Sequence, residues 1–507
     1  MAFTLKPQET IVLKSATFSR FILLTLILIW RTLVSPYDTS APLNPDCLTN
    51  TNPDPDPSLR TVRWPGLSSS IENGIVWDSV YFVRIAQCGY EYEQTYAFLP
   101  LLPVCISFFS RTVFAPLIPL VGERAVLALS GYVINNVAFV FAALYFYRLS
   151  VIILKDPNAA LRASVLFCFN PASIFYSSIY SESLYSLLSI GGLYHLASDR
   201  KNIAVLCLAL SGCARSNGVL NAGYLCFQMM HQAYDAALRK KHWLAFQIVT
   251  AGALRGVCIF APFIAFQAYG YYNICLGHLS NEMRPWCKTT VPVLYNFIQG
   301  HYWGVGFLRY FQLKQLPNFL LASPILSMVL FSIIHYAKSR PQVFFSLGFQ
   351  ATIEEKISGC LILSSDDFSR SDNACTVEKS SSRMQGVSSN QNFPIGHNLK
   401  QRKKRIIEGS PDVIPLEYES TRAHGYLSAS VLPFVLHLGF MAATAFFVVH
   451  VQVATRFLSA GPPLYWFSSY LMISPTTSRK WGYMIWVYSA AYILLGSLLF
   501  SNFYPFT

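Results

Sequence analysis

Apolar runs of about 20 residues recur along most of the chain, and this pattern limits the folds that it can adopt. A helix of that length crosses the roughly 30 Å hydrocarbon core of a bilayer. Only 12% of the 507 residues are charged, against roughly a quarter in soluble domains. We therefore expect an all-α polytopic membrane protein. About ten transmembrane segments are predicted, near residues 16–34, 97–121, 125–148, 160–178, 182–198, 203–229, 243–270, 314–337, 427–457 and 481–501.

Basic residues outnumber acidic ones by 38 to 25, which gives a net charge of +13. In a membrane protein such an excess marks cytosolic loops, and no RNA-binding fingerprint accompanies it, so nucleic acid is not an expected partner. The clusters at 239–241, 338–340 and 401–405 and the N-terminus, which precedes an uncleaved signal anchor, are predicted to be cytosolic. Counting spans from there places 35–95, 271–313, 458–480 and Lys155 on the lumenal side and the turn at 181–183 in the cytosol.

Three regions follow from this pattern. Residues 1–340 are predicted to form a transmembrane core that includes the lumenal loop 35–95, and residues 424–507 form the C-terminal spans. Residues 341–423, rich in Ser, Asn and charge, predict a disordered cytosolic loop. Prolines in AFLPLLPV and FNPAS are compatible with broken or re-entrant helices. The twelve cysteines include no CxxC pair, so we expect no metal site and no cofactor.

Charged residues in or beside membrane spans are costly, and each is a candidate functional group. Asp78 follows Trp77 in VWDSVYFVRI, where the sequence predicts a helix along the membrane surface. It fits two interpretations equally well: an N-cap of that helix, or a catalytic carboxylate.

Arg215 lies in another apolar run, LCLALSGCARSNGVLNAGYLCF, beside Ser216 and Asn217. Two interpretations remain open. A structural ion pair with Glu182 on a neighbouring span would satisfy a buried charge. Alternatively, Arg215 and Asn217 face a phosphate or sugar hydroxyl in a polar cavity.

The loop at 271–313 combines basic and aromatic residues. Arg284, Arg309 and the nearby Lys314 accompany Trp286 and Trp303, a combination that suits a lipid phosphate bearing a sugar. Interfacial snorkelling is the commoner explanation for any single one of these cations. Cys275 and Cys287 share this stretch, and both a disulfide and two free thiols are compatible with it.

Five longer stretches resemble one family: WDSVYFVRIAQCGYEYEQTYAFLPLLP, FNPASIFYSSIYSESLYSLL, ARSNGVLNAGYL, YWGVGFLRYFQLKQLPNFLLASP, and HVQVATRFLSAGPPLYWF with the ending NFYPFT. They are similar to the GPI mannosyltransferase 2 family (PIG-V) of the endoplasmic reticulum membrane, over most of the chain outside 341–423. The resemblance implies a GT-C type glycosyltransferase with many helical spans and a lumenal active site. The family's reaction transfers the second mannose, in α-1,6 linkage, from dolichol-phosphate-mannose to a glucosaminyl-acyl-phosphatidylinositol acceptor that carries one mannose. A small accessory membrane subunit is compatible with it.

The resemblance also implies residue roles. The family's essential acid in the first lumenal loop falls on Asp78, next to Trp77, and Pro171 of FNPAS carries over as functionally important. An inverting displacement needs a base, predicted to be Asp78, and cations for the departing phosphate, so no metal is expected. Trp77, Asn217 and Trp286 complete the predicted substrate-binding set, in which the candidate phosphate ligands are Arg215, Arg284, Arg309, Lys314, His450 and Arg456.

Two other functions stay open. One is a different glycosyltransferase that uses a polyprenyl-phosphate sugar. The other is a lipid transporter or scramblase, although the sequence shows no internal repeat and no matched pair of broken helices of the kind that many transporters have.

Overall fold

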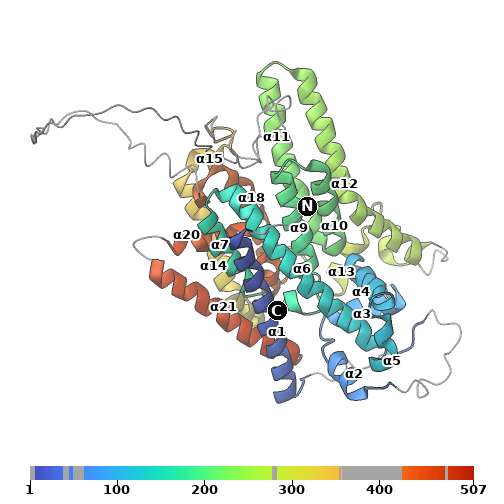
Figure 1. The fold of residues 1–507 in the computed structure, drawn as a ribbon. Helices are drawn as coiled ribbons and strands as arrows, with labels where there is room; N and C mark the ends of the chain where they lie inside the picture. The colour runs from blue at the N-terminus through green and yellow to red at the C-terminus, as the bar shows by residue number, and fades with distance from the viewer. Residues whose placement is uncertain are drawn as a thin grey trace, which may run out of the picture.

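The computed structural model describes residues 6–37, 45–48, 62–276, 283–352, 355–356, 425–473 and 478–506, and its regular structure is helical throughout (Figure 1). Most of the polar loop, including the 401–405 cluster, lies outside the described residues. The α-helices are α1 (Pro7–Leu33), α2 (Pro65–Glu72), α3 (Ser79–Cys88), α4 (Leu101–Arg111), α5 (Ile118–Val121), α6 (Glu123–Leu154), α7 (Pro157–Cys168), α8 (Ser173–Ser177), α9 (Glu182–Ala197), α10 (Lys201–Ala214), α11 (Ala222–Leu238), α12 (His242–Cys275), α13 (Leu294–His301), α14 (Leu316–Ser339), α15 (Pro341–Phe345), α18 (Leu432–Phe447), α19 (Ala454–Leu458), α20 (Pro462–Leu471) and α21 (Ser478–Ser501).

Six helical stretches among the described residues are long and apolar enough to cross a membrane. They are Pro7–Leu33, Glu123–Leu154, His242–Cys275, Leu313–Ser339, Ala429–Phe447 and Lys480–Ser501. A seventh span results if Leu101–Arg111 and Ala115–Val121, which meet at a 65° bend, are taken together. A multi-span helical membrane protein is therefore confirmed.

The remaining predicted spans are shorter or broken helices. Residues 160–178 divide into α7 and α8, and the twelve residues of α7 extend only about 18 Å. Residues 203–229 divide into α10, a 3₁₀ segment at Ser216–Asn221, and α11. Non-helical backbone at membrane depth needs protein partners, and these breaks are where polar side chains gather.

The long helix α6 forms the centre of the bundle, packed against α1, α4, α7 and α9. Aromatic rings fill its contact with α7: Phe146 stacks on Phe167 with ring centres 4.8 Å apart. Beside α6 in Figure 1, the pair α11 and α12 extends beyond the other helices.

The bundle has two ends, which side-chain contacts identify. At one end, Glu9 of α1 pairs with Arg148 of α6 at 2.8 Å, and we call this the Glu9 end. Ser428 donates to the Ile153 carbonyl at 3.4 Å, so the Arg340 region lies at the same end. Lys155 follows directly on α6 and therefore lies beside the predicted cytosolic groups, which corrects its lumenal placement.

Two further topology predictions, for the turn at 181–183 and for residues 458–480, were wrong because the membrane spans were miscounted. Tyr180 contacts Asp78, so the adjoining turn at 181–183 lies on the Asp78 side and not opposite it. Residues 458–480 are not a loop on that side, because α20 runs back toward the Glu9 end. There Trp466 donates to Ser150 Oγ at 2.7 Å and Ser469 to the Ala159 carbonyl at 3.1 Å.

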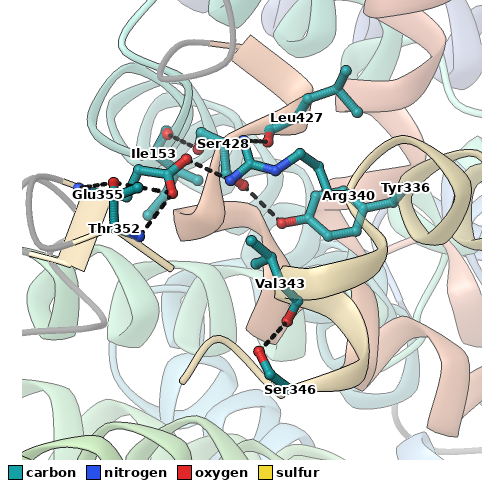
Figure 2. A network of polar contacts seen from close by, with 9 residues as sticks. All are labelled: Ile153, Tyr336, Arg340, Val343, Ser346, Thr352, Glu355, Leu427 and Ser428. Atoms are coloured by element: carbon teal, nitrogen blue, oxygen red, sulfur yellow. Dashed lines mark hydrogen bonds and ion pairs between the residues drawn. The ribbon is translucent and has the colours of Figure 1, made fainter. Parts of the chain in front are cut away.

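A polar network joins the chain on both sides of the long loop (Figure 2). Arg340 forms an ion pair with Glu355 at 2.5 Å and donates to the Leu427 carbonyl at 3.4 Å. Tyr336 of α14 donates to the Ser428 carbonyl at 3.0 Å. The described segments on either side of residues 357–424 therefore contact each other directly.

Arg20 anchors the FNPAS break to the rest of the bundle. This residue, in the middle of α1, is only 3% exposed, and its guanidinium lies 3.8 Å above the ring of Phe139. It donates to the carbonyls of Cys168 (3.3 Å) and Ser173 (3.0 Å) and to Ser177 Oγ (2.9 Å). Carbonyl groups left free where α7 ends are satisfied in this way.

Candidate functional site

The structure joins Asp78 to a cation from the far end of the chain. Arg456 Nη1 lies 3.1 Å from Asp78 Oδ2, although 378 residues separate them. The Asp78 side chain is 35% exposed and that of Arg456 is 21% exposed. The pair is therefore partly shielded but open to an entering molecule.

Local backbone geometry presents Asp78 at the start of α3. Trp77 takes a left-handed conformation, with φ of +54°, which turns the chain sharply before the helix. The Asp78 N–H donates to the Tyr180 hydroxyl at 3.1 Å. Asp78 occupies the N-cap position, but its carboxylate makes no capping hydrogen bond. The position predicted for a cap is correct, whereas the side chain bonds Arg456 instead.

Arg456 is held by the aromatic segment 175–180. Its guanidinium lies 5.4 Å from the ring centre of Phe175 and 5.6 Å from that of Tyr180, within cation–π range. Ser459 Oγ donates to the Arg456 carbonyl at 2.7 Å and lies 2.9 Å from the Tyr176 hydroxyl. The segment that follows Pro171 thus fixes α19. Pro171 itself is buried in the break between α7 and α8.

A second ion pair lies beside the first. Glu182, the first residue of α9, pairs with Arg215 at the C-terminal end of α10. Glu182 is 2% exposed. This geometry confirms the ion pair that the sequence suggested for Arg215, while its side chain remains 18% exposed. Next to it, Ser216 Oγ lies 2.7 Å from the Tyr295 hydroxyl.

The two ion pairs act on each other electrostatically. Burial works to lower the pKa of Arg456, but the Asp78 and Glu182 carboxylates outweigh it and raise that pKa above its ordinary value. Burial also raises the pKa of Tyr180 well above its ordinary value and that of Tyr176 to about 12. Arg456 is therefore a permanent cation facing two acids, and both phenols stay protonated at neutral pH.

Several buried polar atoms at this site have no partner among the described residues. They are Trp77 Nε1, Glu182 Oε2, Arg456 Nε and both polar atoms of the Asn217 amide. Unpartnered buried polar atoms are few in native proteins, so a concentration of them indicates a place for water or a polar ligand.

The predicted lumenal cations lie elsewhere. Arg284 Nη2 lies 3.0 Å from Glu93 Oε2, and Trp286 Nε1 donates to Glu93 Oε1 at 2.7 Å. Tyr302 donates to the same carboxylate at 2.8 Å, so Glu93 joins its own segment to the segments that contain Arg284 and Tyr302. None of the contacts described for Arg284 or Trp286 reaches Asp78 or Glu182.

Three further predicted ligands also lie apart in the described contacts. Arg309 and Lys314 are exposed. The His450 ring stacks on Tyr310 with centres 4.6 Å apart. Burial lowers the pKa of His450, which makes it neutral rather than cationic at neutral pH.

Two disulfides occur among the described residues. Cys275 pairs with Cys287, which resolves the alternative left open by the sequence. Cys47 pairs with Cys88 at the end of α3, a bond that the sequence analysis missed although both residues belong to the same predicted lumenal loop. One group of potential metal ligands occurs in the described residues, Cys47, Cys88 and Glu91, but the disulfide consumes both thiols and Arg84 pairs with Glu91 at 2.7 Å.

Sequence reasoning also missed the aromatic contributors to the site. Tyr176 and Tyr180 lie in the quoted stretch FNPASIFYSSIYSES, but nothing in their spacing separates them from ordinary core aromatics. Glu93 was missed as well, because a single acid in a polar loop carries no periodic signal.

Comparisons with known proteins identify the family of this chain. The family model described as mannosyltransferase (PIG-V) matches residues 8–507. GPI alpha-1,6-mannosyltransferase 2 of Homo sapiens is 29% identical over 78% of this chain and 72% of its own length. GPI mannosyltransferase 2 of Drosophila pseudoobscura pseudoobscura is 30% identical over 85% of this chain and 86% of its own length. No solved structure gives a significant match. The chain belongs to the PIG-V mannosyltransferase family.

Proposed function

We propose that this protein transfers the second mannose, in α-1,6 linkage, from dolichol-phosphate-mannose to a GPI-anchor precursor in the endoplasmic reticulum membrane. The acceptor is glucosaminyl-acyl-phosphatidylinositol carrying one mannose. The names of the relatives supply the linkage and the pathway. The observation in this chain that carries the proposal is the partly open Asp78–Arg456 pair, with its unpartnered polar neighbours.

Asp78 is the proposed general base. Its carboxylate is exposed enough for the acceptor 6-hydroxyl to approach, and accepting that proton during attack contributes about 10²- to 10⁴-fold to the rate. Trp77, whose indole Nε1 is buried without a partner in the described chain, lies beside it as a donor for a sugar oxygen.

Arg456 and Arg215 are the proposed ligands of the donor phosphate. Guanidinium groups bind phosphate oxygens through paired N–H donors, and a preformed cation at a departing oxyanion is worth a few kcal/mol. Because the leaving group is a phosphate that side chains can neutralise, the proposed step requires no metal. Asn217, with both amide atoms free of described partners, suits sugar hydroxyls.

The remaining candidates take outer roles in this proposal. Five predicted ligands lie outside the described contacts of the two ion pairs: Arg284, Trp286, Arg309, Lys314 and His450. We assign them to the lipid headgroup of the acceptor. In this proposal the catalytic site draws on two of the predicted regions, because 1–340 supplies Asp78 and Arg215 and 424–507 supplies Arg456. The predicted loop 341–423 is placed in the cytosol, although its first residues form α15. An accessory subunit is compatible with this arrangement.

A lumenal active site is supported by the disulfides. Disulfides persist in oxidising compartments such as the lumen of the endoplasmic reticulum. Asp78 lies between Cys47 and Cys88 in the sequence, and Cys88 ends the helix that Asp78 begins. The same side contains Cys275–Cys287 in the proposed topology.

The proposal is tested by the lipid that accumulates when the protein is missing. Microsomes lacking it should build up a GPI precursor with one mannose, and restoring the protein should return elongation. A purified preparation should also transfer mannose in detergent, where transport has no meaning. Accumulation of a two-mannose precursor would assign the protein to the following step, and absence of transfer in detergent would favour the transporter alternative.

A further inference from the structure

Glu182 is an acid that the proposed chemistry does not yet use. Its side chain is 3% exposed, against 35% for Asp78, so a substrate hydroxyl reaches Asp78 far more easily. One carboxylate oxygen pairs with Arg215, and the other is buried without a partner among the described residues. A buried carboxylate with one free oxygen is costly, which points to a specific requirement for its charge.

The charge of Glu182 acts on two guanidinium groups. Glu182 binds Arg215 directly, and its carboxylate is among the charges that raise the pKa of Arg456. Arg456 forms its own ion pair with Asp78. Two acids and two arginines thus come from α3, α9, α10 and α19, and the formal charge of the four side chains is zero.

We propose that Glu182 is a positioning residue that holds Arg215 for the donor phosphate. This inference rests on the proposed function. Arg215 joins α10 to the 3₁₀ segment Ser216–Asn221, and its guanidinium forms an ion pair with Glu182. The carboxylate fixes the guanidinium through one N–H edge and leaves the remaining donors for a phosphate.

The consequence of losing this charge is specific. Glu182→Gln keeps the size of the side chain and one acceptor oxygen but removes the negative charge. Arg215 then loses its anchor, and its preorganisation toward a phosphate falls. Proton transfer at Asp78 is a separate step, so the defect should appear in donor binding before it appears in turnover.

The experiment uses the full-length enzyme in detergent with dolichol-phosphate-mannose as donor. Two quantities are measured for each variant: the donor KM and the inhibition constant of dolichyl phosphate, with phosphate-free dolichol as the control ligand. For Glu182→Gln we expect both constants to rise about tenfold, the size of one lost charge-assisted contact, with a smaller change in kcat. Asp199→Asn is the matched control, because Asp199 follows the opposite end of α9 from Glu182 and pairs with Lys201 at 3.2 Å, and it should leave both constants and kcat unchanged. Glu182→Asp, which keeps the charge, should lie between Glu182→Gln and the parent enzyme.

Double substitution separates positioning from a general loss of folding. If Glu182 acts through Arg215, then Glu182→Gln combined with Arg215→Gln should raise the inhibition constant no further than Arg215→Gln alone. A folded Glu182→Gln enzyme with the parent inhibition constant would overturn the inference. If Glu182→Gln does not fold, equal inhibition constants for Glu182→Asp and the parent would overturn it. If Arg215→Gln leaves that constant unchanged, the proposed phosphate site itself fails.

Discussion

Replacing Asp78 by Asn separates its two interpretations. As a helix cap, Asp78 would tolerate Asn, because Asn caps as well as Asp and a lost cap costs only about 1 kcal/mol. The cost of losing the cap should be smaller still, since the Asp78 carboxylate makes no capping hydrogen bond. The lost charge on a partly exposed pair with Arg456 is worth about 1 kcal/mol or less. Asp78→Asn should therefore fold.

The catalytic effect should be much larger. Asn keeps the size and one acceptor oxygen but cannot take the acceptor proton, so we expect mannose transfer to fall by about 10²-fold or more. Asp78→Glu restores the charge but moves the carboxylate by one methylene. It should remain weak, because a misplacement of about 1 Å can itself cost about 10²-fold.

The assay compares initial rates of mannose transfer by purified variants at saturating donor, with thermal stability measured alongside. Asp199→Asn is the matched control. Asp199 pairs with Lys201 at 3.2 Å in the turn between α9 and α10, and its φ of +56° suits Asn. That variant should retain full transfer. Near-parent transfer by a folded Asp78→Asn enzyme would refute the proposal that Asp78 is the base.

Two other predictions concern the segments around the core. Deleting residues 365–398 should leave mannose transfer and expression within about twofold of the parent, because Arg340 already joins Glu355 and Leu427 across the loop. Loss of transfer in normally expressed protein would show that the loop contributes to the reaction. Cys88→Ser should lower the free energy of unfolding by up to about 4 kcal/mol, the value that chain entropy gives for opening a loop of 41 residues. Cys226→Ser, at an exposed free cysteine, is the control and should have little effect. Equal melting temperatures for the two variants, together with equal mobilities on non-reducing gels, would count against the Cys47–Cys88 bond.

How far the sequence predicted this molecule depends on helix length. Long uniform spans such as α6, α12 and α14 were predicted to within about six residues of their ends, because 20 apolar residues have few other stable structures in a membrane. The helix α1 begins nine residues before its predicted start at residue 16. Short helices such as α7 and α20 were misplaced. Their stability comes from neighbours that bury them, as Trp466 shows with its bond to Ser150, and no local pattern reveals those partners.

Some residues of the site were also predictable from the sequence, and others were not. Asp78 was identifiable because a family motif marks it, and Glu182 was named as a partner because buried charges need one. Arg456 was one of six cations suggested for phosphates, and only the fold selects it by bringing α19 to α3. Arg284 and Trp286 belong to the Glu93 contacts instead, a distinction between two basic, aromatic stretches that composition could not make.

The pairing of Arg456 with Asp78 has a consequence for the proposed reaction. The donor is a phosphodiester with one negative charge, and Asp78 carries another before transfer. As the acceptor hydroxyl loses its proton to Asp78, the mannosyl–phosphate bond breaks and the departing phosphate gains the second charge. The sum of the charges stays the same, but one negative charge moves from the carboxylate to the phosphate. Arg456 is bound to that carboxylate at 3.1 Å in the resting site, and protonation of Asp78 weakens that ion pair just as the phosphate needs a cation. A partly buried cation beside the base can therefore interact with the charge first on the carboxylate and then on the phosphate, which accounts for the direct contact of Arg456 with the proposed base.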